Sequence, residues 1–382
     1  MKTKPQFATI LTLIILIFAT IGGYAIGRLM PEPSPAFVKP TQPVFTIFNF
    51  RGGATPVPFS SEEPAAVTID ARIRSFDISP DGKTIAFATS KGVIVEGLDS
   101  KEIHVLAGDE NSFAVKWSFD GAKLAAGNLI MKTPEAGLSH LVIWDTNTWK
   151  TIFESASDSE VSVPFGALAW SPNGRRLAAY VPEHGLAVLD VATGEIISAQ
   201  TDFMPPPTDI DWAPDGSRLI ATGDLGFGFL RWRLGTNESV RLYDPRVGSG
   251  AAQLAWSPDG NRIASGHDSM VCLWTVETNQ CDGLIQAHRS VVSSLAWSPD
   301  GSKLATGGGV IRIWDSQTGR LIIAFGLNEI SIYTELAWLQ PELLVSLETG
   351  GASDAPDIVR FWDLKSGKIL MEFRGQSGTY GQ

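Results

Sequence analysis

The tryptophans of this 382-residue chain recur in two columns. Eleven of the twelve occupy one of two positions that repeat about every 39 to 53 residues, and only Trp149 lies outside both. The first column is clearest in the LAWSPDG runs at 254–260 and 295–301, and the second follows each first-column residue after about 17 to 27 residues. In chain order the columns comprise Ile78, Trp117, Trp170, Trp212, Trp256, Trp297 and Trp338, then Glu96, Trp144, Leu189, Trp232, Trp274, Trp314 and Trp362. Each of the seven periods is long enough for one small sheet.

Every period also carries the local signals of antiparallel strands. In the Ser-Pro-Asp-Gly run at 257–260, proline fixes φ, aspartate can bond to its own backbone and glycine accepts positive φ, which predicts a hairpin turn. Short apolar runs such as 303–306 follow, then strands such as 310–314 that end at the second column. No helical period appears after residue 30. We therefore predict an all-β protein, a seven-bladed β-propeller of four-stranded antiparallel blades.

The repeat resembles the Trp-Asp (WD) repeat propeller family over residues 65–375. Trp-Asp itself occurs at 144–145, 314–315 and 362–363, and the WSPDG turns are similar to those of bacterial-type members. Members of that family often carry a hydrogen-bond network of His, Ser or Thr, Asp and Trp within a blade. Only His288 occupies the histidine position here, and its repeat has Gly307-Gly308-Gly309 where the aspartate belongs. The resemblance therefore implies the fold but no complete network.

The first thirty residues differ in composition from the rest. Lys2 and Lys4 precede about twenty mostly apolar residues at 7–26, enough to cross a hydrocarbon core of about 30 Å as a helix, and Arg28 follows. We predict a transmembrane signal anchor over 1–30, with the amino end in the cytoplasm and the propeller outside it. The alternative is a cleaved secretory signal, with a poor site at Gly23-Tyr24-Ala25, which would leave a secreted or periplasmic protein.

Residues 31–64 are rich in proline and predict a semi-extended linker, and residues 376–382 are a short tail. One stretch at 44–50 (VFTIFNF) is too apolar for a plain linker. It could dock on the propeller wall, lie at the membrane interface, or be a hydrophobic kink in the tether. Two segments could supply the outer strand of the last blade, 65–69 and 369–373. We favour 369–373, with the front segment overlaying it or fraying.

Charge and cysteine content limit the partners and the compartment. The net charge of −11 and the lack of a Lys/Arg stripe make nucleic acid an unexpected partner. Cys272 and Cys281 flank one hairpin on the same face, at an expected Cα separation of about 7 to 8 Å, which is marginal for a disulfide. Both a disulfide formed in an oxidising compartment and two buried free thiols remain open.

No motif for a nucleophile, a nucleotide or a metal ion occurs in the chain, and the five histidines have no metal-ligand spacing. We therefore expect no catalytic residue, no cofactor and no metal. Three charged residues do stand out, because Asp77, Lys116 and Asp211 precede the first column, where most repeats have alanine. An ion pair between the adjacent blades, Asp77 with Lys116, is the simplest expectation. The alternative is a channel site, a hydrolase-like enzyme or small-ligand binder with Asp77 and Asp211 as its carboxylates.

Two longer connections, at 128–140 and 347–357, join the second and third strands of their repeats. They should rise on one rim, because blades 7 and 2 flank blade 1 in a closed ring; neutral loop drift is the alternative. Phe203 and Met204 precede a triple proline, and Phe227 sits in a Gly-flanked loop, so we predict these three as partner-binding residues on that rim. Burial in the rim is the alternative. The predicted function is a non-catalytic, membrane-tethered, extracytoplasmic scaffold that binds protein.

Overall fold

The computed structural model describes residues 46–48, 65–100, 102–108, 110–131, 137–156, 166–203, 205–223, 228–236, 238–248, 250–326, 332–349 and 355–376. The predicted anchor at 7–26, most of the linker and the end of the tail lie outside these ranges. None of the described residues form a helix that is long and apolar enough to cross a membrane.

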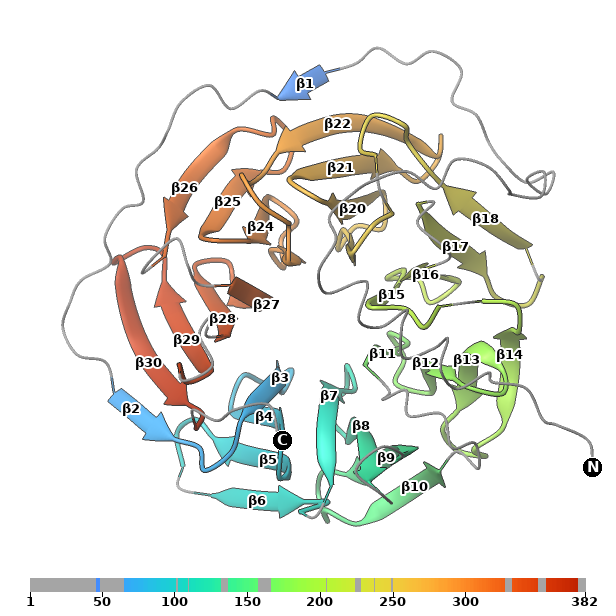
Figure 1. Ribbon diagram of the computed structural model, residues 1–382, viewed down its shortest axis with the longest axis vertical. Coiled ribbons are helices and arrows are strands. Elements are labelled where there is room, and N and C mark those ends of the chain that lie inside the picture. Colours follow the sequence, from blue (N-terminus) through green and yellow to red (C-terminus); the bar gives the residue numbers. More distant parts are fainter. Residues whose placement is uncertain are drawn as a thin grey trace, which may run out of the picture. The chain divides into compact units, whose positions relative to one another are not determined.

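Seven antiparallel sheets of four strands each are arranged around a central channel (Figure 1). Blades 1 to 3 contain β3 (Ile73–Ile78), β4 (Thr84–Thr89), β5 (Gly92–Gly97) and β6 (Ile103–Leu106); β7 (Asn111–Trp117), β8 (Lys123–Met131), β9 (Gly137–Asp145) and β10 (Thr151–Ala156); and β11 (Leu168–Trp170), β12 (Arg176–Val181), β13 (Gly185–Asp190) and β14 (Ile196–Gln200). The all-β seven-bladed fold expected from the repeat is confirmed.

Blades 4 to 7 continue around the ring in chain order. They contain β15 (Ile210–Trp212), β16 (Arg218–Thr222), β17 (Phe229–Arg233) and β18 (Glu238–Leu242); β19 (Gln253–Trp256), β20 (Arg262–His267), β21 (Met270–Thr275) and β22 (Gln280–Gln286); β23 (Ser294–Trp297), β24 (Lys303–Gly307), β25 (Ile311–Asp315) and β26 (Leu321–Phe325); and β27 (Ile332–Gln340), β28 (Leu343–Thr349), β29 (Ile358–Asp363) and β30 (Lys368–Arg374). In every blade the first of these four strands is innermost, and the fourth is the farthest of them from the channel (Figure 1).

The first hairpin of most blades closes through one repeated side-chain arrangement. In blade 1 the Ser79 hydroxyl donates to Asp81 Oδ1 over 2.6 Å and accepts the N–H of Thr84 over 3.0 Å. Asp120, Asp259 and Asp300 accept the equivalent serine hydroxyl in their own turns. These acids therefore stabilise turns, as the sequence predicted.

Blade 7 is closed by the back of the chain. β30 pairs antiparallel with β29 as the fourth strand, and β2 (Ala65–Thr68) adds a fifth strand in parallel outside it. The preference for 369–373 is confirmed, and the front segment overlays it. β1 (Thr46–Phe48), from the apolar stretch at 44–50, pairs in parallel with the outer strand β22 of blade 5 (Figure 1).

Two local expectations need correction. The Cα atoms of Cys272 and Cys281 lie 5.9 Å apart, closer than expected, because the β21–β22 ladder shifts register between Leu273 and Trp274, and the two residues form a disulfide. The connection at 128–140 is mostly strand, since β8 runs to Met131 and β9 begins at Gly137. Residues 132–136 and 350–354, at the tips of the two long connections, lie outside the described ranges.

Candidate functional site

The innermost strands surround a cavity of about 570 Å³ at the central channel. Most of its lining is small or apolar, as expected for side chains crowded near the axis of a ring. Six charged residues from blades 1, 2, 4 and 7 also line it, and all are partly buried. They are Arg74, Asp77, Lys116, Asp209, Asp211 and Glu335.

The four carboxylates in this cavity each bind the backbone of the next blade. Every one accepts an N–H group from the innermost strand that follows it in the ring, so these charges connect sheets. The contacts are Asp77 Oδ2 to Trp117 N over 2.7 Å, Asp209 Oδ2 to Leu254 N over 2.8 Å, Asp211 Oδ2 to Trp256 N over 2.8 Å, and Glu335 Oε2 to Phe76 N over 2.9 Å. We call these four residues the carboxylate clamps.

The remaining junctions are joined by the first-column tryptophans instead. At each, the indole N–H donates over 2.9 to 3.1 Å to the carbonyl of the residue that precedes the first column in the blade before. The four donors are Trp170, Trp212, Trp297 and Trp338. Within the described part of the chain, the indole N–H groups of Trp117 and Trp256 have no acceptor. These are the two tryptophans whose preceding blade carries Asp77 or Asp211, so one contact replaces the other.

Lys116 does not bond to its expected partner. Its ammonium lies 2.8 Å from Glu335 of blade 7, whereas the Asp77 carboxylate is bonded to the amide of Trp117. Burial opposes the charge on Lys116, but Glu335 and then Asp77 outweigh this and raise its pKa. The expected ion pair of Asp77 with Lys116 is thus replaced by the pair of Glu335 in blade 7 with Lys116 in blade 2, which reaches across blade 1.

Burial changes the acidity of the aspartates in the channel. It raises the pKa of Asp77 to about 6, against the charge of Lys116, and raises the pKa of Asp211 to about 6. For Asp209 burial, with a contribution from the charge of Asp211, raises the pKa to about 7. Three carboxyl groups that titrate near neutrality therefore face one cavity. No three or more His, Cys, Asp or Glu side chains among the described residues lie close enough together to hold a metal ion.

The predicted partner-binding trio is only partly described. Phe203 is 3% exposed and packs in an apolar cluster with Ile210, Trp212 and Leu230, so its side chain belongs to the core between blades. Met204 and Phe227 lie outside the described residues, and their predicted role stays a prediction. Phe203 is thus buried in the core between blades, beyond the partial burial in the rim that was the alternative.

The hydrogen-bond network of His288 lacks the aspartate of the family pattern, as the sequence predicts. His288 Nε2 lies 2.9 Å from Thr306 Oγ1, which also accepts the indole N–H of Trp314 over 3.0 Å. Arg312, not an aspartate, contacts the other ring nitrogen at 2.8 Å. Burial, together with the charge of Arg312, lowers the pKa of His288 to about 3, so the ring is neutral at physiological pH.

The sequence singled out two of the four clamps. Asp77 and Asp211 were conspicuous because they replace alanine, whereas Asp209 and Glu335 lie two residues before the equivalent position of their strands. Strand alternation was the signal that could have found them, because residues i and i+2 share one side of a strand.

Comparisons with known proteins agree with this architecture. The family described as WD domain, G-beta repeat matches residues 248–275 and 279–315, which lie in blades 5 and 6. A chain of the solved structure titled "Crystal Structure of Mitotic Checkpoint Complex" is 19% identical, with a TM-score of 0.63, over 86% of this chain and 99% of that one. The repeat matches and the seven blades together support a WD-repeat propeller.

Proposed function

We propose that this chain is a non-catalytic scaffold that binds protein partners and is held at a membrane by its amino-terminal segment, with the propeller on the extracytoplasmic side. The carboxylate clamps carry the proposal. A channel enzyme would need Asp77 and Asp211 as free acids or bases, but here each carboxylate accepts an amide of the next blade. The charged groups of the channel thus hold the ring together, and WD-repeat propellers are typically interaction platforms.

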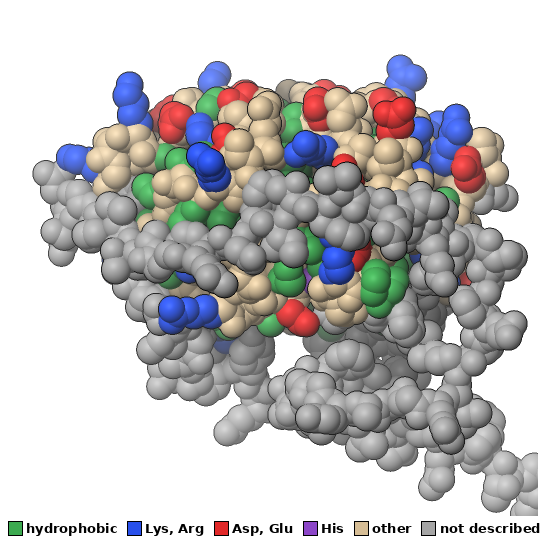
Figure 2. Space-filling model, turned by 90° about the horizontal axis from the view of Figure 1, so that it is seen from above, with side chains coloured by type: hydrophobic (Ala, Val, Ile, Leu, Met, Phe, Trp, Pro, Cys, Tyr) green, Lys and Arg blue, Asp and Glu red, His purple; other side chains and the backbone are tan. Residues whose placement is uncertain are grey.

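The outer wall of the ring supports a role in protein binding. Ile103 and Val105 on β6 are 57% and 62% exposed, and Ile152 on β10 and Ile197 on β14 are also exposed, so three consecutive outer strands present branched apolar side chains. On the side drawn in Figure 2, hydrophobic side chains reach the surface of the wall and charges of both signs are interspersed along its upper edge. Exposed apolar side chains beside sheet edges favour protein contacts.

Two features support the proposed location. The disulfide between Cys272 and Cys281 fits an oxidising compartment. The apolar run at 7–26, with Lys2 and Lys4 before it, fits an anchor whose amino end stays inside.

Crosslinking on intact cells followed by purification of the full-length chain tests both parts. We expect specific protein partners to copurify from the membrane fraction, and protease added outside to cleave the propeller. Recovery of the full-length chain from the cytoplasmic soluble fraction would contradict the location. Absence of any reproducible crosslinked partner would contradict the scaffold.

A second function is favoured by one observation. Three aspartates with raised pKa face a cavity of about 570 Å³, and perturbed acids in a cavity are typical of functional sites. A small cationic ligand in the channel would be recognised by these groups. Its binding should strengthen as pH rises through about 6 to 7 and weaken when Asp209 is replaced by asparagine.

A further inference from the structure

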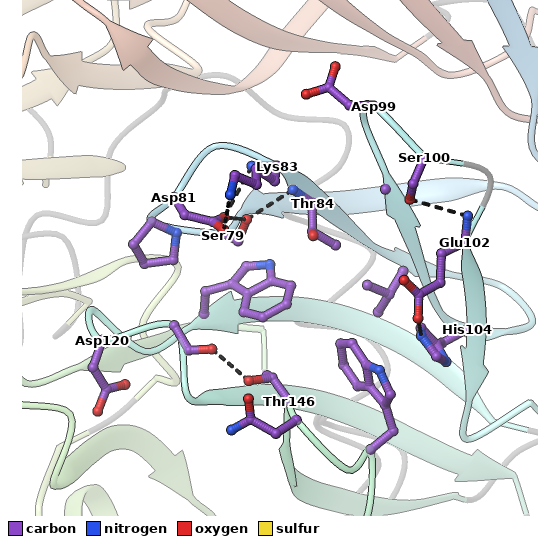
Figure 3. Close-up of a pocket in the computed structure, with 17 residues that line it drawn as sticks. Ser79, Asp81, Lys83, Thr84, Asp99, Ser100, Glu102, His104, Asp120 and Thr146 are labelled. Atoms are coloured by element: carbon purple, nitrogen blue, oxygen red, sulfur yellow. Dashed lines mark hydrogen bonds and ion pairs between the residues drawn. The ribbon is translucent and has the colours of Figure 1, made fainter.

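A second cavity, of about 740 Å³, lies between blades 1 and 2 on the face that carries the Ser-Pro-Asp-Gly turns. In Figure 3, Asp81 and Asp120 lie on one side of it, Glu102 and His104 lie on the other, and Thr84 lies between them. Asp99 also lines the cavity, and Lys83 is its only Lys or Arg among the described lining residues. The walls are completed by Trp117 and Trp149. We call this space the junction pocket.

At the junction pocket, blade 1 lacks a basic side chain that the second strands of other blades supply. The residue that begins the second strand is basic in blades 2 to 6, at Lys123, Arg176, Arg218, Arg262 and Lys303. Lys123 donates to the carbonyl of Gly174, Arg262 to that of Ser316 and Lys303 to that of Pro341, over 3.4, 2.9 and 3.3 Å. Each of these cations therefore crosses to a turn of the next blade.

Blade 1 has Thr84 at this position, and its short side chain supplies no cation. The turn that it faces is built as in the other blades. The Thr146 hydroxyl donates to the Gly121 carbonyl over 2.6 Å, just as Ser316 donates to Gly301 over 2.7 Å, so Thr146 corresponds to the residue that receives Arg262. The receiving turn is present in blade 2, but blade 1 has threonine and no basic side chain at position 84 to reach it.

Two other junctions have different side chains at this position. Between blades 4 and 5 a cavity of about 850 Å³ is lined by the chain's own Arg218 and Arg231, and Arg231 donates to the Val276 carbonyl over 3.0 Å. Between blades 7 and 1 the equivalent residue is Leu343, which packs in an apolar cluster with Ile78. The junction pocket has neither a basic nor an apolar residue at this position.

Trp149, the tryptophan outside both columns, forms the aromatic wall at a conformational cost. Its N–H donates to the Asp145 carbonyl over 2.7 Å, the contact that Gly194 and Gly319 make in their own turns. Glycine suits this position because φ is positive, yet Trp149 adopts φ of 53° here. Its ring lies 4.6 Å from that of His104 and edge-on to Trp117 at 6.1 Å.

The turn acids Asp81 and Asp120 of the junction pocket carry charge at neutral pH, because hydrogen bonds within their turns lower the pKa of each carboxyl. The hydroxyl of Ser79 and the amide of Lys83 donate to Asp81 and lower its pKa. Asp99 and Glu102 are exposed at the mouth. Tryptophan faces and carboxylates together favour a cation, through cation–π attraction and charge-assisted hydrogen bonds.

We propose that the junction pocket binds an arginine or lysine side chain of a protein partner, which takes the place held at other junctions by the chain's own basic residue. The inference rests on the proposed scaffold function and names the chemistry of one contact in it. Trp149 would cover the aliphatic stem, and the carboxylates at the rim would meet the charged head.

The test uses the full-length protein and capped tripeptides with a central Arg, Lys or citrulline, with binding followed by tryptophan fluorescence or indole NMR signals. We expect the Arg and Lys peptides to bind at least about ten-fold more tightly than the citrulline peptide. Thr84→Arg should fill the pocket from within and abolish binding, whereas the matched control Thr84→Val should bind like the parent. Trp149→Gly should lower affinity about ten-fold without lowering the melting temperature, because it restores the usual turn residue.

Equal binding of all three peptides, or unchanged binding in both Thr84→Arg and Trp149→Gly, would overturn the proposal. Trp149→Gly decides the outcome should Thr84→Arg fail to fold. The crosslinking experiment separates the two proposals, since loss of a crosslinked partner in Thr84→Arg but not in Thr84→Val links this pocket to capture. Peptide binding without any crosslinked partner would contradict the scaffold and leave the pocket standing.

Discussion

The carboxylate of Asp77 accepts the backbone N–H of Trp117 across the junction of blades 1 and 2, with 2.7 Å between the two atoms. The same tryptophan has an indole N–H with no acceptor among the described residues, whereas Trp170 at the next junction donates its indole N–H to a carbonyl. The ring therefore has two interchangeable ways of joining consecutive blades. An aspartate before the first column selects the amide contact, and alanine or lysine permits the indole contact.

Replacing Asp77 by alanine should destabilise the propeller by about 1 to 3 kcal/mol, because it leaves the buried amide of Trp117 without an acceptor. Asp77→Asn keeps an acceptor oxygen and should cost less than half as much. Urea unfolding followed by tryptophan fluorescence measures both changes, with Asp99→Asn on the surface as the control. Equal stability of the alanine and asparagine variants would contradict the clamp.

Stability should fall as pH rises through the channel aspartates. Asp209 titrates near pH 7 in the folded state but near its ordinary value of 3.8 when unfolded, so the folded chain binds more protons between these values. The free energy of unfolding therefore decreases over this range as pH rises. Asp209→Asn should be more stable than the parent at pH 8 by about 1 to 2 kcal/mol, with a smaller difference at pH 4. A difference that does not change with pH would show that Asp209 is not the titrating group.

Shortening the Phe203 side chain should lower the stability of the protein, because this residue is buried and not part of the surface. Phe203→Ala removes a nearly fully buried ring from a core between blades, which costs about 3 to 5 kcal/mol. Phe203→Leu should cost less, since it keeps most of the apolar volume. Chemical denaturation measures both changes. A cost below about 1 kcal/mol for the alanine variant would contradict the burial of Phe203 and indicate a surface position.

Deleting residues 366–382 should be far more damaging than deleting residues 31–68. The first deletion removes β30, the fourth strand of blade 7, whereas the second removes only the added strands β1 and β2. Thermal unfolding of the two truncated chains, each compared with the parent, measures the ranking. A larger loss from the front deletion would mean that β2 closes the ring.

The fold was accessible from the sequence because each blade is a local unit. Strands about ten residues apart pair with one another, and the turns that set their register contain proline, aspartate and glycine in fixed positions. The clamps were only partly accessible. Asp77 and Asp211 stand out as substitutions of alanine, but the partner of Lys116 is Glu335, 219 residues away, and only closure of the ring brings them together.

The junction pocket could not be predicted from the sequence for a related reason. Trp149 is visible in the sequence as an exception to the repeat. Its role in the pocket, however, follows only from the residues that it and Thr84 replace, a glycine in the turn and a basic residue at the start of the second strand. Neither replacement can be interpreted until the blades are superposed and the contact made by Arg262 or Lys303 is known. In a repeat protein, a specific site can lie where one repeat differs from the others, and comparison of the repeats in the structure identifies it.

The parallel pairing of β1 with blade 5 and of β2 with blade 7 has a mechanical consequence. A pulling force applied to the amino end of the chain would reach β1 first and β2 next, and both are additions to blades that already have four strands. Detaching these two strands in sequence would absorb the load, which lengthens the amino-terminal segment while every blade keeps its four strands. Tension on the amino-terminal segment would therefore not reach the four-stranded blades until both added strands had detached.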